Sequence, residues 1–468
     1  MNYKQVLKAK LHPSLYTGFR YIYAKTGANA KYAKAFRDTS QFLERSQWWT
    51  RSELEAYQMK QLTHLLRHAY ENVPYYRRVF DEHGIKPMDI QSLEDFRKIP
   101  FITKEMIQEN IQEMVAKNFA RRKLEYITTG GSTGIPMGFY IERGATEGRE
   151  KAFMFAQWRR VGYKSGDRSA VLRGSVVQGA GLGKYWEYDP IHNNLILSSY
   201  HMTDETLKQY VEKIREFKPA FIQAYPSAAT ILASYMRQNQ VEPFESVKAI
   251  LCGSENLYPW QRELLGNSFH CRIYSWYGHA EKAALAGECE NSNYYHVFPE
   301  YGIFELVGSS GETIGDEGGT GEIVATGFNN YAMPLIRYRT MDLATKSNAC
   351  CDCGRNYPLI KKIEGRLQEL IVTGEGRFIS MTAINMHSDI FDNVKQFQFL
   401  QEEKGKVILN LVKRATYTSR DDAIIREELM KKLGDEMYLK IQYKDEIPRT
   451  PSGKYRFLIQ KLPVAFGD

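Results

Sequence analysis

The feature that most constrains the fold is a regular alternation of helical and extended segments between residues 149 and 251. Apolar residues recur at helical spacing in some segments and form short strand-like runs in the segments between them. In chain order these segments are 149–160, 169–172, 204–217, 221–224, 227–236 and 247–251. The alternation is typical of an α/β fold with a mostly parallel sheet. Because such sheets bind ligands at the carboxyl ends of their strands, the residues that follow each strand are candidates for a functional site.

The flanking segments predict the rest of the architecture. Residues 40–75 have helical spacing that ends at Pro74, whereas residues 297–345 indicate antiparallel strands with glycine-rich turns. A chain of 468 residues exceeds what one hydrophobic core usually supports. We therefore expect a large α/β body with a small β layer, followed by a small α+β domain. The expected divisions are a basic N-terminal segment at 1–37, a large domain at 38–364 and a C-terminal domain at 365–468.

The net charge of +8 comes from the N-terminal segment alone. Residues 1–37 contain eight Lys or Arg and no Asp or Glu, so the rest of the chain carries 55 charged residues of each sign. Aromatic residues such as Tyr16 and Phe19 are interleaved with these charges, so the segment could rest on anionic lipid headgroups or another polyanion. We favour the simpler interpretation of a solvated helix face. No nucleic-acid partner is expected.

Two observations favour a cytoplasmic protein. No apolar run is long enough to cross a bilayer, and the N-terminus lacks the apolar core and cleavage site of a secretory signal. Six cysteines are also too few for a disulfide scaffold in a chain of this length. The predicted location is the cytoplasm, with peripheral membrane contact if the basic segment binds lipid.

A run of hydroxyl and glycine residues at 128–136 follows a strand-like stretch at 124–127. Glycine lets backbone N–H groups turn toward an anion, and the threonine and serine hydroxyls add donors for phosphate oxygens. The pattern predicts a phosphate-binding loop, although a flexible linker would have the same composition. The candidate ligands in the loop are Thr128, Thr129, Ser132, Thr133 and Gly134.

Three later stretches also suit a nucleotide. Gly253-Ser254-Glu255 follows an apolar run, where a strand would open onto a crevice. Tyr277, followed by Gly278, would present an aromatic ring for stacking, and Glu281 would present a carboxylate for Mg²⁺, which prefers oxygen ligands and phosphate. Asp342 could accept hydrogen bonds from two ribose hydroxyls. Taken singly, such residues are more often core aromatics or solvated acids.

The order of these motifs is more specific than any one of them. Along the chain stand Thr-Thr-Gly-Gly-Ser-Thr-Gly-x-Pro, Tyr-Gly-x-x-Glu, Tyr-Arg-Thr-x-Asp, Gly-Arg and Pro-Arg-Thr-Pro-Ser-Gly-Lys. From about Thr128 to Lys454 the chain resembles the adenylate-forming superfamily of acyl-CoA synthetases and peptide-synthetase adenylation domains. Residues 68–76 and 101–104 are similar to the phenylacetate-CoA ligase branch, including its relatives associated with capsular polysaccharide.

The resemblance implies an enzyme that uses ATP and Mg²⁺ to convert a carboxylic acid into an acyl-adenylate and pyrophosphate. It also implies a hinge after Gly365-Arg366 and a mobile C-terminal domain whose Lys454 enters the site during adenylation. Coenzyme A is the usual acceptor in the superfamily. An amine on a sugar or glycan intermediate is an alternative acceptor, and a non-catalytic nucleotide-binding scaffold is a second alternative function.

The same resemblance assigns roles to the candidate residues. The β- and γ-phosphates would be held by Ser132, Thr133 and Gly134, and Mg²⁺ by Glu281. The expected adenosine contacts are Gly253, Ser254, Glu255, Tyr277, Gly278, Asp342 and Arg366. The residues expected at the acid pocket are Tyr225, Ser227, Trp276 and His279, and the expected catalytic residues are Lys454 and Glu281.

The chain departs from the family pattern at several positions. Met137 stands where a lysine often follows the proline of the loop, as is usual in the phenylacetate-type branch. Ala280 stands where a threonine commonly touches the α-phosphate. Gln368-Glu369 replaces the usual hinge pair, so the domain movement and the second half-reaction are less firmly implied than adenylation.

Cysteine and histidine form a second constellation late in the chain. Cys289 and His296 flank a predicted turn, and Cys351 and Cys353 bring two thiolates close together. A Cys₃His set is typical of structural zinc, because protein atoms fill all four coordination positions. Cys350 could replace Cys351, and free buried thiols are the alternative. The phenylacetate-type branch includes members with cysteine and histidine at corresponding places.

Overall fold

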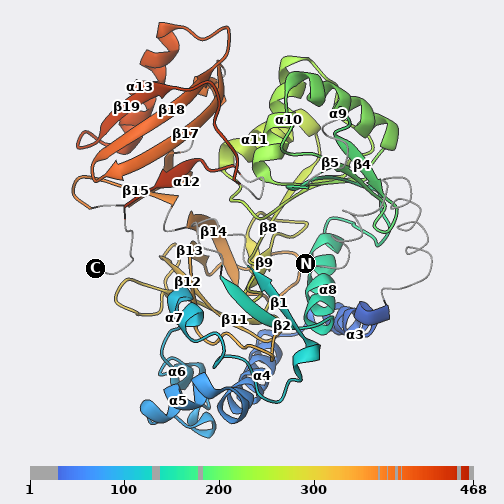
Figure 1. Cartoon of the computed structure of the whole chain (residues 1–468), viewed down its shortest axis with the longest axis vertical. Helices are drawn as coiled ribbons and strands as arrows, with labels where there is room; N and C mark the ends of the chain where they lie inside the picture. Colours follow the sequence, from blue (N-terminus) through green and yellow to red (C-terminus); the bar gives the residue numbers. More distant parts are fainter. Residues whose placement is uncertain are drawn as a thin grey trace.

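The chain folds around a twelve-stranded sheet in the large domain and a separate four-stranded sheet in the C-terminal domain (Figure 1). The computed structural model describes residues 30–128, 137–175, 177, 183–366, 369–376, 378–384, 388–391, 393–450 and 455–462. The predicted α/β fold class, with a small domain at the C-terminus, is confirmed.

One half of the large sheet is almost entirely parallel. Its parallel strands are β3 (Ser169–Leu172), β5 (Asn194–Leu197), β6 (Phe221–Ala224), β7 (Ala249–Cys252) and β8 (Arg272–Gly278), and β4 (Trp186–Asp189) closes the edge antiparallel to β5. The accompanying helices are α8 (Ala145–Arg159), α9 (Asp204–Phe217), α10 (Pro226–Gln238) and α11 (Pro259–Phe269). The predicted alternation is therefore present, with the two short strands β4 and β5 added at the edge.

The other half of the sheet is antiparallel and begins at β8. The order continues through β9 (Leu285–Gly287), β10 (Tyr295–Val297), β14 (Leu359–Arg366), β13 (Tyr338–Ser347), β12 (Thr320–Gly327) and β11 (Gly302–Val307). Because β8 is hydrogen-bonded to β7 on one side and to β9 on the other, the antiparallel strands continue the same sheet. The small β layer expected at residues 297–345 is thus an extension of the α/β sheet and not a separate cap.

Helices and a hairpin cover the antiparallel half. They are α3 (Ala30–Ser46), α4 (Arg51–Asn72), α5 (Pro74–Glu82), η1 (Pro87–Asp89), α6 (Leu93–Phe96), α7 (Lys104–Glu109), η2 (Arg121–Lys123), β1 (Leu124–Thr128) and β2 (Gly138–Glu142). The helical region expected at 40–75 is broken at Thr50, which begins α4 with a capping box to Glu53. Helix α3 runs across residue 37, the expected end of the basic segment, and residues 1–29 lie outside the described residues.

The C-terminal domain packs one long helix on its own sheet. Its elements are β15 (Leu370–Val372), β16 (Phe378–Ser380), α12 (Met381–Ile384), η5 (Ser388–Phe391), β17 (Val394–Glu403), β18 (Lys406–Lys413), α13 (Ser419–Leu433), β19 (Tyr438–Tyr443) and β20 (Leu458–Gln460). The core formed by α13 and this sheet also takes up Tyr258 from the large domain. The ring of Tyr258 lies 5.4 Å from that of Phe457, so the two domains share apolar contact.

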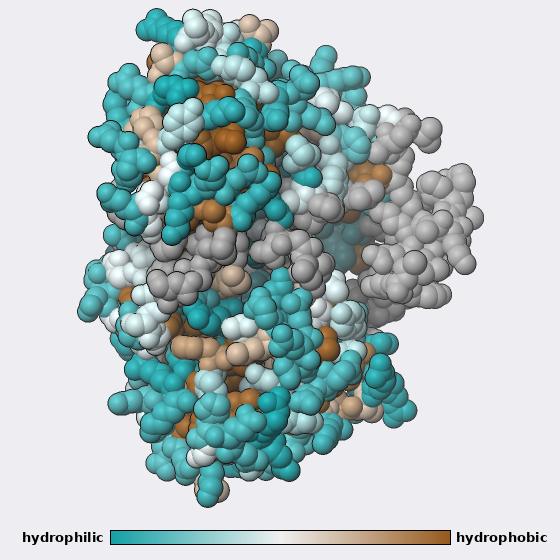
Figure 2. Space-filling model, turned by 60° about the vertical axis from the view of Figure 1, so that its left-hand side comes forward, coloured by the Kyte–Doolittle hydropathy of each residue, from teal (hydrophilic) through white to brown (hydrophobic). Residues whose placement is uncertain are grey.

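The face of the molecule in Figure 2 is mainly hydrophilic, and its hydrophobic residues form separate patches. Among the described residues, no helix combines the length and apolar character needed to cross a membrane.

Candidate functional site

The candidate nucleotide residues meet around the carboxyl end of β8, where the sheet changes from parallel to antiparallel. Tyr277 and Gly278 end this strand, and Glu281 lies in the turn that follows it. Asp342 on β13 pairs with Arg366 on β14 in the strand register. The sheet therefore brings together residues that are far apart in the sequence.

Asp342 is the centre of a buried polar cluster. The Tyr277 hydroxyl donates to Asp342 Oδ2 at 2.7 Å, and Arg366 Nε lies 3.3 Å from Oδ1. Burial raises the pKa of Tyr277 well above its ordinary value, and the neighbouring Asp342 charge adds to this effect. The phenol is therefore a neutral donor, and Arg366 balances the carboxylate charge. A carboxylate fixed in this way can accept hydrogen bonds from a ligand with paired hydroxyls.

Glu281 is held by donors from two directions. His279 Nδ1 lies 3.1 Å from Glu281 Oε2, and the Tyr338 hydroxyl donates to Oε1 at 3.2 Å. Burial raises the pKa of Glu281, but the hydrogen bond and charge of His279, a backbone hydrogen bond and the charge of Arg366 together bring this pKa down to about 2. The carboxylate is therefore ionised at neutral pH. A single fixed carboxylate fits Mg²⁺, which completes its coordination with phosphate and water oxygens.

The turn after β7 packs closely against the ring of Trp276 on β8. A Cβ atom on Gly253 would collide with the Trp276 ring, so only glycine fits there. Ser254 has a positive φ of 68°, and its hydroxyl accepts a hydrogen bond of 2.7 Å from Arg173 Nη2. This backbone is the one predicted to lie along adenine.

Glu255 links the two domains. Its carboxylate accepts hydrogen bonds from the backbone N–H and hydroxyl of Ser227, at 2.9 and 3.0 Å, and from the backbone N–H of Tyr455 at 3.1 Å. Arg449 Nη1 also lies 3.4 Å from the Ser227 hydroxyl. The expected adenine contact Glu255 and the expected pocket residue Ser227 thus also anchor the C-terminal domain in this arrangement.

Part of the predicted site falls where no structure is described. Thr128 is the exposed last residue of β1, and β1 pairs with β2 on the other side of the loop. The predicted phosphate ligands Thr129, Ser132, Thr133 and Gly134 and the predicted catalytic Lys454 lie outside the described residues. Their roles stay predictions.

Sequence reasoning missed two residues at this site, the side chain of Arg173 and the backbone N–H of Tyr455. Arg173 directly follows β3, a strand whose bounds were predicted, so inspection of the residue after each predicted strand would have found it. Tyr455 reaches Glu255 from the other domain, and no local pattern in the sequence indicates such a contact.

The fold brings the predicted Cys₃His set together next to β9 and β10. The candidate ligand atoms of Cys289, His296, Cys351 and Cys353 all lie within 4.8 Å of one another. Cys353 Sγ is 3.3 Å from His296 Nε2, and Cys289 Sγ is 3.6 Å from Cys351 Sγ. Cys350 is exposed and is not part of the cluster, whereas Cys351 is.

The imidazole of His296 is oriented for metal binding. Its Nδ1 lies 3.1 Å from the carbonyl of Tyr294, so this nitrogen carries the proton and Nε2 faces the thiols. The backbone N–H groups of Asn291 and Ser292 lie 3.3 and 3.2 Å from Cys289 Sγ and donate to it. These donors favour a thiolate. The donor set and its orientation fit tetrahedral zinc.

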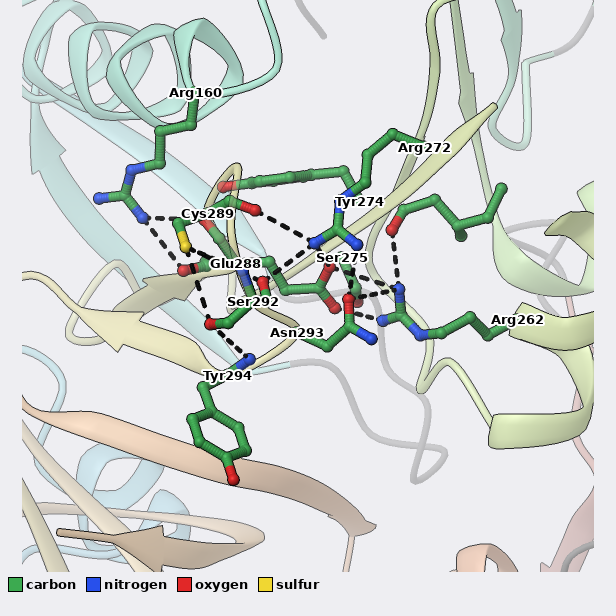
Figure 3. A network of polar contacts seen from close by, with 12 residues as sticks. Arg160, Arg262, Arg272, Tyr274, Ser275, Glu288, Cys289, Ser292, Asn293 and Tyr294 are labelled. Carbon is green, nitrogen blue, oxygen red and sulfur yellow. Dashed lines mark hydrogen bonds and ion pairs between the residues drawn. The ribbon is translucent and has the colours of Figure 1, made fainter. Parts of the chain in front are cut away.

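A buried ionic network stabilises the turn that carries Cys289 (Figure 3). Arg262 and Arg272 converge on the fully buried Glu288, and Arg272 Nη2 also donates to the carbonyl of Cys289 at 3.1 Å. Arg160, at the end of α8, donates to the carbonyls of Gly287 and Glu288 at 3.1 and 3.0 Å. These contacts hold the turn that carries Cys289 in position.

Comparison with known proteins finds relatives named CapK and phenylacetate-coenzyme A ligase. Residues 371–461 match a family described as the CapK C-terminal domain. Over 402 residues the chain is 26% identical to "Protein CapK" of Staphylococcus aureus, and the aligned region covers 84% of this chain and 86% of CapK. Over 341 residues it is 28% identical to a "Phenylacetate-coenzyme A ligase" of Thermus thermophilus, which covers 69% of this chain and 72% of the relative.

Solved structures of adenylate-forming CoA ligases share the fold. The crystal structure of 2-hydroxyisobutyryl-CoA ligase in the postadenylation state aligns with a TM-score of 0.70 at 19% identity, over 89% of this chain and 92% of that chain. The same ligase in the thioesterification state aligns with a TM-score of 0.58. The chain is therefore a relative of CapK and the phenylacetate-CoA ligases with the fold of adenylate-forming CoA ligases, as its motifs predict.

Proposed function

We propose that this protein is an ATP-dependent, AMP-forming acid:CoA ligase. The carboxylate oxygen of the acid attacks the α-phosphorus of ATP, which forms an acyl-adenylate and releases pyrophosphate. The sulfur of coenzyme A then attacks the acyl carbonyl and releases AMP. The observation that carries the proposal is the meeting of Glu281, Asp342 and Tyr277 around the end of β8, in the order and fold of adenylate-forming ligases.

Each residue has a defined task in this proposal. Asp342 binds the ribose hydroxyls, with Arg366 and Tyr277 holding its carboxylate in place. Glu281 holds Mg²⁺, which would offset the charge of the phosphates. Lys454, from the C-terminal domain, would neutralise the charge that develops between the acid and the α-phosphate. Enzymes catalyse substitution at a phosphate mainly by positioning the reactants and neutralising charge, so no protein nucleophile is required.

The acceptor is the part of the proposal that most needs an experiment. We expect acyl-CoA and AMP when the protein is incubated with ATP, Mg²⁺, coenzyme A and a panel of aryl, fatty and amino acids, with products identified by mass spectrometry. Release of AMP only when an amino sugar replaces coenzyme A would favour the alternative acceptor. The similarity to CapK over most of both chains is the reason to include that arm.

Asp342→Asn is expected to weaken ATP binding, because the charged hydrogen bonds to the ribose hydroxyls are lost. The KM for ATP should rise about 10- to 100-fold, because hydrogen bonds to a charged group contribute about 1.5–3 kcal/mol. The diagnostic measurement compares ATP with 2′-deoxy-ATP. The wild type should discriminate between them, and the variant should lose most of this discrimination. Asp316→Asn, an exposed aspartate, is the control. An unchanged preference in Asp342→Asn would contradict the ribose assignment.

We also propose that Cys289, His296, Cys351 and Cys353 bind one structural Zn²⁺. The support is the mutual distance of the four ligand atoms and the orientation of His296 by the Tyr294 carbonyl. The metal would join the turn after β9 and the strand β10 to the loop between β13 and β14. Because protein atoms supply all four ligands, the site has no position for substrate.

The basic N-terminal segment stays outside this proposal. Residues 1–29 are not among the described residues, so membrane contact through them and the cytoplasmic location are still sequence predictions.

A further inference from the structure

Arg173 is a cation at the edge of the predicted acid pocket. It follows β3 at the carboxyl end of the parallel strands, where it reaches Ser254 in the turn after β7. Its guanidinium lies 5.8 Å from the ring centre of Tyr225 and 5.5 Å from that of Trp276. Both aromatic residues were expected at the acid pocket from the sequence. Stacking on two rings fixes the guanidinium plane while leaving its N–H edge available.

The guanidinium uses little of its hydrogen-bonding capacity. Among the described residues its one hydrogen bond runs from Nη2 to the Ser254 hydroxyl at 2.7 Å, although an arginine carries five N–H donors. Within the part of the chain that is described, Arg173 forms no ion pair. The negative charge of Glu255 raises the pKa of Arg173, but the carboxylate oxygens of Glu255 already accept hydrogen bonds from Ser227 and Tyr455.

Four arginines of the large domain contrast with Arg173, because each of them faces a carboxylate. Arg262 and Arg272 face Glu288, Arg337 faces Glu305 and Arg366 faces Asp342. Burial is the largest influence on the pKa of Arg173 and lowers it, as expected for a charge without such a partner. A desolvated cation is costly unless an anion accompanies it. No carboxylate of the described residues forms an ion pair with Arg173, so an anionic ligand would complete its contacts.

We propose that Arg173 binds a second anionic group on the carboxylic acid that this site activates, so that the preferred substrate is a dicarboxylic or otherwise dianionic acid. A carboxylate can pair with the guanidinium edge through two parallel hydrogen bonds. The proposal rests on the acid:CoA ligase function proposed above and specifies its substrate class.

One further donor near Arg173 supports a polar ligand. The indole N–H of Trp276, whose ring centre lies 5.5 Å from the guanidinium, is buried and has no hydrogen-bond partner among the described residues. Buried donors without partners are uncommon and call for a ligand or water. An acid with a purely apolar tail would leave this donor and those of Arg173 unsatisfied, whereas oxygen atoms on the tail would accept from them.

The test compares acids that differ only in the second charge. Suitable pairs are butanoate and succinate, hexanoate and adipate, and phenylacetate and 4-carboxyphenylacetate, each measured as kcat/KM for ATP–pyrophosphate exchange. The wild type should prefer the dianionic member of at least one pair by about tenfold or more. Arg173→Gln should remove this preference by raising the KM for the dianionic acid, with the neutral-tailed acid and the KM for ATP changed less than threefold.

Two controls separate a substrate contact from a structural role. Arg173→Lys should retain part of the preference because the positive charge remains. Arg168→Gln, at the other end of β3, removes an exposed arginine and should change neither acid. An equal loss for both members of each pair in Arg173→Gln, together with a higher KM for ATP, would overturn the proposal and assign Arg173 to holding Ser254.

The wild type itself can also refute the substrate class. If it exchanges pyrophosphate with neutral-tailed acids as well as with their dianionic partners in every pair, the proposal is wrong while the ligase function stands. If no acid supports exchange in protein that binds ATP by calorimetry, the ligase function fails and the substrate proposal fails with it.

Discussion

Glu281→Gln is expected to lower the rate of adenylation on the order of 10²-fold at limiting Mg²⁺, a loss similar to removal of one electrostatic contact to a transition state. The side chain keeps its size and can still accept from Tyr338, so the local packing should survive. What it loses is the negative charge that binds the metal. The measurement is the rate of pyrophosphate exchange as a function of Mg²⁺ concentration.

Higher Mg²⁺ should recover part of the activity of Glu281→Gln, because the variant binds the ion more weakly and not in a different place. Glu263→Gln, an exposed residue of α11, should behave as the wild type. A Glu281→Gln variant that keeps its exchange rate within threefold at every Mg²⁺ concentration would remove Glu281 from the metal site.

Loss of the proposed zinc should have the largest effect on stability. We expect about one equivalent of zinc in protein purified without added metal, and loss of that zinc in Cys351→Ser and Cys353→Ser. Structural zinc contributes strongly to folding, so the melting temperature of the large domain should fall by about 5 °C or more. Elemental analysis and calorimetry test the two parts separately.

The adjacent Cys350 provides a matched control. It is exposed and outside the cluster, so Cys350→Ser should keep both the zinc and the melting temperature. Wild-type protein with well below one equivalent of zinc would contradict the metal assignment. Equal zinc content in Cys350→Ser and Cys351→Ser would contradict the choice of ligand.

The alternating segments could be predicted because each carries its own periodicity. The strands at 169–172 and 221–224 and the helix at 204–217 have the expected bounds. The continuation of the sheet through β8 could not be predicted, since a strand sequence does not state which neighbours it pairs with on each side. Likewise, the break at Thr50 depends on a cap that competes with helical spacing running through it.

The candidate site could be predicted where motif and strand end coincide. Tyr277, Glu281 and Asp342 stand in ordered motifs, and the fold brings them together. The choice of Cys351 over Cys350 could not be made from sequence, because neighbouring residues of a loop have no period that says which one points inward. The link from Glu255 to Tyr455 needs the placement of a second domain.

The most direct test of the account is carboxylate-dependent ATP–pyrophosphate exchange in the absence of any acceptor. The account predicts exchange that requires Mg²⁺ and a carboxylic acid, and that is lost in Lys454→Ala. Protein that binds ATP but shows no exchange with any acid would contradict the account, as would full exchange in Lys454→Ala.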